Sequence, residues 1–314
     1  MAMIQTATGQ INTANLGFTL MHEHVICVDH SMRAQYPDVF HRPTELQRAI
    51  AQLVEVRETG VQTLVDGTPI DLGRDPGFIR DVARGSGMQI IVATGFYYQV
   101  PYRFMYRPSA ELVDLMVRDI TTSIGDSGVR AGVIKCATEP TMHRMNERVV
   151  RASAKAHRKT GVPIYTHTYP ANKTGLDQIR VFREEGVDLA RVVIGHSDDS
   201  GDLTYLEEIL QSGAYCGMDR IGVPNPFTSE QRADMVVALV ERGYADRIVL
   251  SHDASCHIDH FADGAIEKHM PDWKFTYIPR RFLSMLRERG VSDSVIDQMT
   301  VGNPRRIFEQ VAPY

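Results

Sequence analysis

Short apolar runs alternate with longer amphipathic segments along most of the chain. The runs are rich in β-branched residues and nearly continuous in their hydrophobicity, which is typical of parallel strands that are buried on both faces. There are eight of them: Thr19 to Cys27, Val61 to Asp66, Gln89 to Gly95, Ala131 to Ala137, Val162 to Thr168, Arg191 to His196, Ala214 to Asp219 and Arg247 to Asp253. Their spacing predicts repeated strand–helix units.

The segments between the runs carry helix signals. Three of them, residues 44–59, 146–160 and 229–242, are each followed directly by glycine, as in connections from a helix to the next strand. Eight such units predict an α/β fold, a (β/α)8 TIM barrel formed by a single domain over residues 1–314. A doubly wound open sheet is the alternative, and it is disfavoured because no G-x-G-x-x-G follows any run.

The segment from Ala254 to Ile278 is expected to be a long loop after the eighth strand. Long loops at the carboxyl ends of barrel strands usually build the substrate pocket. We therefore expect this segment to shape substrate recognition.

Composition excludes several classes of protein. The chain has 314 residues, a formal net charge of −5 and no basic run, which argues against nucleic acid or an anionic membrane as partner. Its four cysteines are widely separated, so neither a disulfide framework nor a zinc finger is expected. No secretory signal and no apolar stretch long enough for a membrane span is apparent. We expect a soluble, cytoplasmic protein.

Polar residues stand at the carboxyl ends of the apolar runs, the end of a barrel strand that faces the catalytic mouth. The first run contains His22-Glu23-His24. Residues two apart in a strand point to the same side, so His22 and His24 can bind one metal ion while Glu23 turns away. Alone this pattern is a weak signal, because cupin-like barrels carry it too, and it is not the HExxH pattern of zinc proteases.

Three further runs end in metal-binding residue types. His167 ends the fifth run, His196 the sixth and Asp253 the eighth, whereas His252 should point to the opposite side from Asp253. Four neutral imidazoles and a carboxylate suit zinc, manganese, iron or cobalt. Taken together, these side chains predict a metal site rather than a set of structural histidines.

Lys135 lies inside the apolar fourth run. Burial and a nearby cation would both favour its neutral amine. The lysine can extend to the barrel mouth or pair with a carboxylate. Beside four histidines and an aspartate, a second role fits better, because a lysine amine that has taken up carbon dioxide becomes an anionic carbamate able to bridge two metal ions.

These residues resemble a known family. The stretch Gly17-Phe18-Thr19-Leu20-Met21-His22-Glu23-His24-Val25 is similar to the N-terminal signature of the phosphotriesterase family in the amidohydrolase superfamily, and the resemblance runs from Gly9 to Asn303-Pro304-Arg305-Arg306. The chain is most similar to the phosphotriesterase-like lactonases. The segments that carry this likeness are Gly95-Phe96-Tyr97, Gly217-Met218-Asp219-Arg220, and Ser251-His252-Asp253 with Cys256.

The resemblance implies a binuclear metal site at the C-terminal mouth of the barrel. Three ligands would hold the more buried ion, namely His22, His24 and Asp253, and two would hold the more exposed one, namely His167 and His196. Carboxylated Lys135 (N6-carboxylysine) and a hydroxide would bridge them. Two divalent transition metals are implied, zinc first, with cobalt, manganese or iron as alternatives. The resemblance also implies a homodimer.

The resemblance further implies a hydrolase that opens lactones, acyl-homoserine lactones or other γ- and δ-lactones, and that hydrolyses organophosphate triesters as a side activity. Arg220 favours the lactonase branch, because true phosphotriesterases carry a histidine there. The chain departs from the pattern in a short loop, residues 221–229, and in His260, which stands where an aromatic residue is common. The alternatives are a primary phosphotriesterase and a metal-binding barrel without catalysis.

Roles follow for several residues under this hypothesis. Asp253 would accept a proton from the attacking hydroxide and pass it to the leaving alkoxide. Tyr97 would donate a hydrogen bond to the substrate or hydroxide, and Arg220 would orient the pocket loops or the lactone ring. Cys256, Phe227 and Trp273 are expected to form pocket walls.

Overall fold

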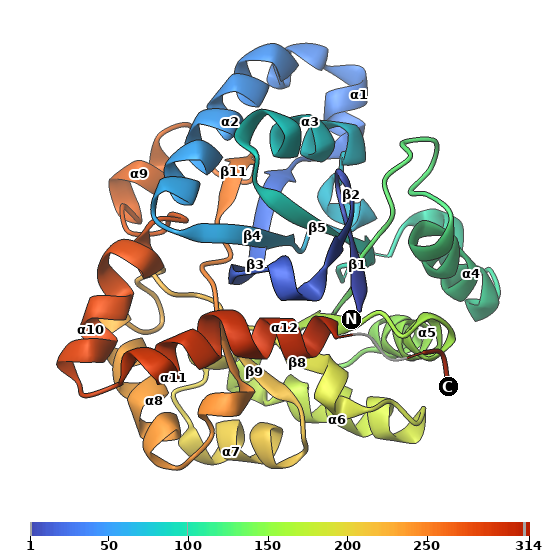
Figure 1. Cartoon of the computed structure of the whole chain (residues 1–314). Helices are drawn as coiled ribbons and strands as arrows, with labels where there is room; N and C mark the ends of the chain where they lie inside the picture. Colours follow the sequence, from blue (N-terminus) through green and yellow to red (C-terminus); the bar gives the residue numbers. More distant parts are fainter. Residues whose placement is uncertain (1, 99, 310–311) are drawn as a thin grey trace.

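The computed structural model describes residues 2–98, 100–309 and 312–314. Within this part of the chain, nine strands form one parallel sheet in the order β10-β9-β8-β7-β6-β5-β4-β3-β11 (Figure 1). The strands are β3 (Phe18–Cys27), β4 (Val61–Asp66), β5 (Gln89–Gly95), β6 (Val133–Ala137), β7 (Ile164–His167), β8 (Val192–Ile194), β9 (Tyr215–Met218), β10 (Ile248–Leu250) and β11 (Ser255–Ile258). A separate antiparallel hairpin joins β1 (Met3–Thr6) and β2 (Gly9–Asn12).

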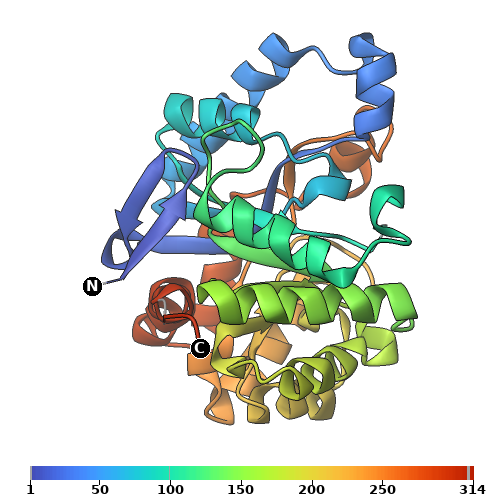
Figure 2. The ribbon, with the colours of Figure 1, turned by 90° about the vertical axis from the view of Figure 1, so that its right-hand side faces the viewer.

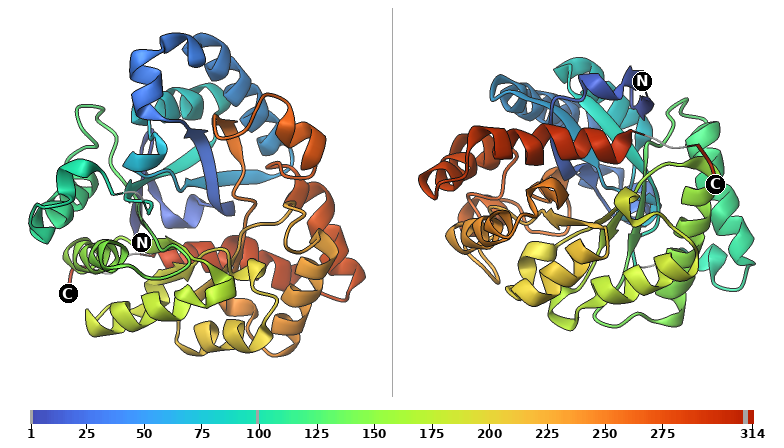
Figure 3. Two further views of the ribbon diagram at one scale, coloured as in Figure 1. Left: turned by 180° about the vertical axis from the view of Figure 1, so that it is seen from behind. Right: turned by 60° about the horizontal axis from the view of Figure 1, so that its bottom comes forward.

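Helices follow most strands and surround the sheet, as the view in Figure 3 (right) shows. They are α1 (His30–Gln35), α2 (Arg42–Glu58), α3 (Pro76–Ser86), α4 (Ser109–Thr121), α5 (Arg144–Thr160), α6 (Thr174–Glu184), α7 (Leu203–Gln211), α8 (Ser229–Glu241), α9 (Ala265–His269), α10 (Leu283–Glu288), α11 (Asp293–Asp297) and α12 (Asn303–Phe308). Among the described helices, none is both long and apolar enough to span a bilayer.

The two ends of the sheet are joined by one short stretch of chain. β10 pairs with β9 and β11 pairs with β3, and only residues 251–254 lie between β10 and β11. Within that connection, the amide of Asp253 donates to the carbonyl of His22 at 3.0 Å, and the amide of His24 donates to the carbonyl of Ala254 at 2.8 Å. The predicted α/β class is confirmed, and the curled sheet is consistent with a TIM barrel; the joined edges exclude the open doubly wound sheet.

A compact apolar layer fills the inside of the curled sheet. Every strand from β3 to β10 contributes to it, through Met21, Val65, Ile91, Val133, Tyr165, Val193, Tyr215 and Val249. Ile4 and Leu16 from the N-terminal segment and Ile307 and Phe308 from α12 complete the same cluster. These terminal segments lie near each other (Figure 2). The layer gives the strands a rigid interior, so their carboxyl ends can hold polar groups in fixed positions.

The segment from Ala254 to Ile278 differs from the prediction of one long loop. It contains strand β11 and the short helix α9. The reason is tertiary: β11 is only four residues long, and its hydrogen-bonding partner β3 lies more than 200 positions earlier in the chain. No local pattern encodes such a pairing.

Candidate metal centre

Six side chains expected to bind metal meet in one cavity. The cavity has a volume of about 370 Å³, and its lining includes His22, His24, Lys135, His167, His196 and Asp253. They come from β3, from β6, and from the ends of β7, β8 and β10. Because the strands are parallel, their carboxyl ends lie at the same edge of the sheet and bring these residues together.

A register shift in β3 determines the direction of its two histidine side chains. The pairing of β3 with β4 shifts register between Leu20 and Glu23. Such a bulge changes the alternation of side chains, so that Met21 belongs to the interior layer while His22 still reaches the cavity. Beyond the shift the alternation resumes: His24 points to the cavity, and Glu23 points away from it, as expected.

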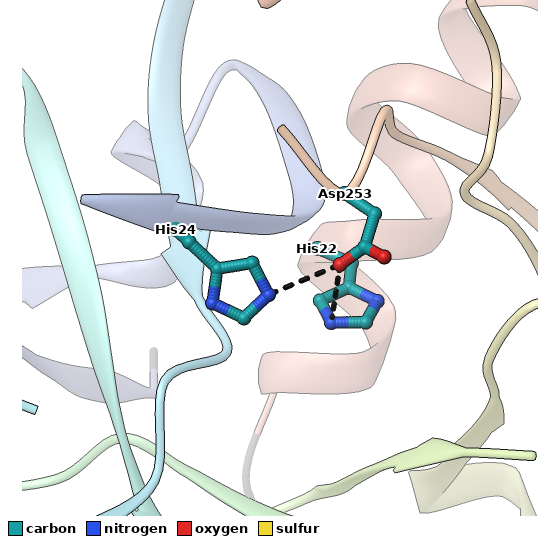
Figure 4. A group of neighbouring side chains, drawn as sticks. All are labelled: His22, His24 and Asp253. Atoms are coloured by element: carbon teal, nitrogen blue, oxygen red, sulfur yellow. Dashed lines mark hydrogen bonds and ion pairs between the residues drawn. The ribbon is translucent and has the colours of Figure 1, made fainter. Parts of the chain in front are cut away.

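Asp253 lies beside both histidines of β3 (Figure 4). Its Oδ1 is 3.0 Å from Nε2 of His24 and 3.3 Å from Nε2 of His22. Nε2 of His22 also lies 2.6 Å from Nζ of Lys135.

A second pair of histidines adjoins this group. Nε2 of His196 is 2.7 Å from Nδ1 of His167 and 4.0 Å from Oδ2 of Asp253. The two groups of potential ligands therefore adjoin the one carboxylate of Asp253.

The outward nitrogens of three histidines are fixed by partners that the sequence reasoning missed. Nδ1 of His22 and Nδ1 of His196 lie 2.7 and 2.8 Å from the two oxygens of Asp219. Nδ1 of His24 lies 2.8 Å from Oγ1 of Thr68. A polar residue directly after an apolar run was the available signal, because Asp219 follows β9 and Thr68 follows β4 by two positions.

This arrangement fits a metal centre. When Nδ1 carries the proton and donates to an outer acceptor, Nε2 presents its lone pair, as metal-binding histidines generally do. Nε2 of His22, His24 and His196 all lie close to the carboxylate of Asp253. Imidazole nitrogens with a shared carboxylate are the donors that zinc and its neighbours prefer.

The protonation states of the cluster agree with this fit in part. Burial, and then the charge of Lys135, lowers the pKa of His22 to about 3, and burial lowers the pKa of His167 well below its ordinary value. Both are therefore neutral, which is the metal-binding form. Burial also lowers the pKa of His24, but Cys27 and Asp253 outweigh it and raise that pKa above the ordinary value. A metal ion would displace a proton there.

Lys135 is 1% exposed, and burial lowers its pKa from 10.5 to about 8. A larger fraction of its amine is therefore neutral near pH 7 than for a lysine in water. The neutral amine is the form that can add carbon dioxide.

Tyr97 and Arg220 flank the cluster on the side of the cavity. The hydroxyl of Tyr97 is 3.2 Å from Nδ1 of His167, and burial raises the pKa of this phenol, which keeps it protonated. Nε of Arg220 is 3.1 Å from Oδ2 of Asp253. Burial would raise the pKa of Asp253, but His22 and Arg220 hold it well below its usual range.

Two of the expected pocket walls lie elsewhere. Trp273 lines the cavity, whereas Cys256 and Phe227 do not. Cys256 points into the core between strands and helices, and its neighbour Ser255 lines the cavity instead. Asp253 lies in the connection before β11 begins at Ser255, so the alternation of side chains in a strand cannot be counted from it.

Phe227 packs over Gly201. An added Cβ at Gly201 would lie 2.4 Å from Cζ of Phe227, so the absence of a side chain there makes room for the ring. The sequence alone does not reveal this contact between two loops. Further wall residues that were not predicted include Tyr98 and Phe261, and His260 is also part of the lining.

Comparisons with known proteins extend over nearly the whole chain. The model of the phosphotriesterase family matches residues 2–308. A "Phosphotriesterase homology protein" of Mycobacterium tuberculosis is 45% identical over 325 aligned positions that cover 100% of both chains. An "Aryldialkylphosphatase" of Saccharolobus solfataricus is 34% identical and covers 95% of this chain and 96% of its own length.

A more distant relative is an "N-acetyltaurine hydrolase" of Danio rerio, 25% identical over 96% of this chain and 97% of its own. Among solved structures, the phosphotriesterase from Mycobacterium tuberculosis superposes with a TM-score of 0.96 and 44% identity, covering 99% of this chain and 100% of that one.

Proposed function

The chain belongs to the phosphotriesterase family of hydrolases, and from that membership we propose that it is a metal-dependent hydrolase that opens lactones. Acyl-homoserine lactones and other γ- or δ-lactones are the proposed substrates, and organophosphate triesters are proposed as slower side substrates. The observation that carries the proposal is the set of Nε2 atoms of His22, His24 and His196 grouped around the carboxylate of Asp253.

Two divalent ions would be held by this cluster. His22, His24 and Asp253 would bind one, and His167 and His196 the other. Lys135, carboxylated on Nζ, would bridge them, and its buried amine with a pKa of about 8 supports that modification. When bound, the ions would polarise the scissile carbonyl and activate a water molecule for attack. Zinc is proposed first, because the donors are imidazole and carboxylate.

The chain's own groups would complete the reaction. Tyr97 keeps its proton, so its hydroxyl can donate a hydrogen bond to the substrate oxygen. Asp253 is ionised, so its carboxylate can accept a proton from the attacking water and deliver it to the leaving alkoxide. Arg220 contacts Asp253 and lines the cavity, so it can orient both the carboxylate and the lactone ring.

Phosphotriester hydrolysis is the second candidate. Two relatives that match nearly the full length of this chain have names that refer to phosphotriester or aryldialkylphosphate substrates. Attack on phosphorus develops negative charge on an oxygen, as attack on a lactone carbonyl does, so the same groups can serve both reactions.

Steady-state rates on protein of measured metal content decide between the candidates. The panel holds acyl-homoserine lactones of several chain lengths, simple γ- and δ-lactones, and one activated aryl phosphotriester. We expect the highest kcat/KM on a lactone. A phosphotriester preference of several orders of magnitude would reverse the ranking. No turnover of any substrate by metal-replete protein would favour the barrel that only binds metal.

A further inference from the structure

Glu23 stands between two proposed metal ligands in sequence but faces away from them. It is 1% exposed, and its carboxylate accepts four hydrogen bonds from the stretch that joins the ends of the sheet. Oε1 accepts from Oγ of Ser251 at 2.7 Å and from the amide and Nδ1 of His252 at 3.0 and 2.6 Å. Oε2 accepts from the amide of Ala254 at 2.9 Å. A buried carboxylate thus holds residues on both sides of Asp253.

Asp253 needs such support because its backbone is in an uncommon conformation. Its φ is +59°, in the left-handed region that residues with a Cβ rarely adopt. Main-chain amides next to a left-handed residue form a concave site for an anion. Here the amides of His252 and Ala254 converge on Glu23, and the amide of Asp253 itself bonds to the carbonyl of His22.

The same carboxylate is linked to the wall of the cavity through His252. Since Nδ1 of His252 donates to Glu23, Nε2 is free to accept, and the amide of Ile278 donates to it at 2.9 Å. The carbonyl of His252 also accepts from Nε1 of Trp273 at 2.8 Å. His252 therefore ties both Trp273 and the end of the segment from 254 to 278 to strand β3.

We propose that Glu23 is a positioning residue for the hydrolytic reaction. Through the amides of His252 and Ala254 it sets the backbone that aims Asp253 at the metal site. Through the imidazole of His252, which accepts from the amide of Ile278, it holds the end of the segment that carries Trp273. The role rests on the proposed function of the site, but its structural consequences can be measured without any substrate.

Glu23→Gln tests the first half of the proposal. The variant keeps the size of the side chain but replaces one of its two acceptor oxygens with an NH2 group. Because an NH2 group donates, it cannot accept from the donor or donors that bond to that oxygen in the wild type. We expect the affinity for zinc to fall by about 10- to 100-fold, the usual loss for a partner that orients metal ligands. In the metal-free variant, amide hydrogen exchange should accelerate in a peptide that contains residues 252–254.

Asp119→Asn is the matched control. Asp119 is also 1% exposed, and it accepts from Arg74 and Thr94 away from the cavity. Its loss should lower stability while leaving zinc affinity and exchange at 252–254 as in the wild type. Wild-type zinc affinity and exchange in Glu23→Gln would overturn the proposal. An equal loss of zinc affinity in Asp119→Asn would overturn it too, because the effect would then be one of general destabilisation.

His252→Asn tests the second half and does not depend on the first variant folding. The asparagine amide can still donate to Glu23, but it has no atom at the position of Nε2. We expect metal content and kcat to be retained, KM to rise several-fold, and exchange to accelerate near Ile278 in the metal-free protein. Unchanged KM together with unchanged exchange near Ile278 would overturn the link from Glu23 through the imidazole of His252 to the segment that carries Trp273. If the wild type has no hydrolase activity, the exchange data still decide the role of Glu23.

Discussion

Asp219 connects the two halves of the proposed metal site, and replacing it with asparagine should weaken both. Its Oδ2 accepts from Nδ1 of His22 and from the hydroxyl of Tyr165, at 2.7 and 2.8 Å. Its Oδ1 accepts from the amide and Nδ1 of His196, at 2.7 and 2.8 Å. Two donors therefore converge on each oxygen. An asparagine can satisfy only one of these pairs, because its NH2 group is itself a donor.

The size of the effect follows from the tautomer of the affected histidine. When Nδ1 loses its acceptor, the proton is better placed on Nε2, where it removes the lone pair that a metal needs. Loss of such a partner typically lowers metal affinity by about 10- to 100-fold, or roughly 1.4 to 2.8 kcal/mol. Stability should also fall by about 1–3 kcal/mol for each buried donor left without an acceptor.

Titration of metal-free protein with zinc, with bound ions counted by mass spectrometry, measures the affinity. Tyr165→Phe is the matched control, because it removes one partner of Asp219 but leaves both histidines paired. It should bind zinc as the wild type does. If Asp219→Asn binds two zinc ions with the affinity of the wild type, the orientation of His22 and His196 by Asp219 does not contribute to zinc affinity, and the reasoning is refuted.

Three further outcomes are expected. Lys135→Ala should lose metal and activity, and a short-chain carboxylic acid should restore part of both; full metal content in this variant would contradict the bridging role. Trp273→Ala should raise KM for lactones several-fold with metal content unchanged, measured by steady-state kinetics across chain lengths; equal KM at every chain length would remove this residue from the pocket wall. Burial lowers the pKa of His157 below 6.5. Between its pKa values in the folded and unfolded states, His157 is therefore protonated in the unfolded protein but neutral in the folded one. Stability should then fall as the pH drops below about 6.5, by at most about 1.4 kcal/mol per pH unit, and urea midpoints at pH 7.5 and 5.5 should differ less in His157→Gln than in the wild type.

The sequence allowed the positions of the strands along the chain and the proposed ligands to be predicted, because both depend on local pattern. Each buried parallel strand is a continuous apolar run; His22, His24 and Lys135 lie within such runs, and the other proposed ligands lie at or near the end of one. β4 and β5 have the predicted bounds and β3 begins one residue earlier than predicted, whereas the later strands are shorter; the run from Arg247 to Asp253, for example, contains only β10 (Ile248–Leu250). The apolar pattern indicates which residues are buried, and residues remain buried beyond the last hydrogen bond between neighbouring strands.

Features that depend on contacts between distant residues could not be predicted. The register shift in β3, the pairing of β11 with β3, and the contact of Phe227 with Gly201 each need two segments to meet. Which of Ser255 and Cys256 faces the cavity depends on where β11 begins to pair with β3, and this too needs two distant segments to meet. The role of Glu23 was half visible: its direction followed from alternation, but its partners lie about 230 positions away.

The stretch from Ile248 to Ile258 both closes the sheet and carries Asp253, and this has an evolutionary consequence. An insertion or deletion within it would disturb architecture and chemistry together, so its length should be under strong selection. Residues 259–277, which follow it and include Phe261 and Trp273 of the cavity wall, carry no barrel strand. New substrate preferences can arise there by exchange or lengthening of the chain while the hydrolytic core is inherited unchanged.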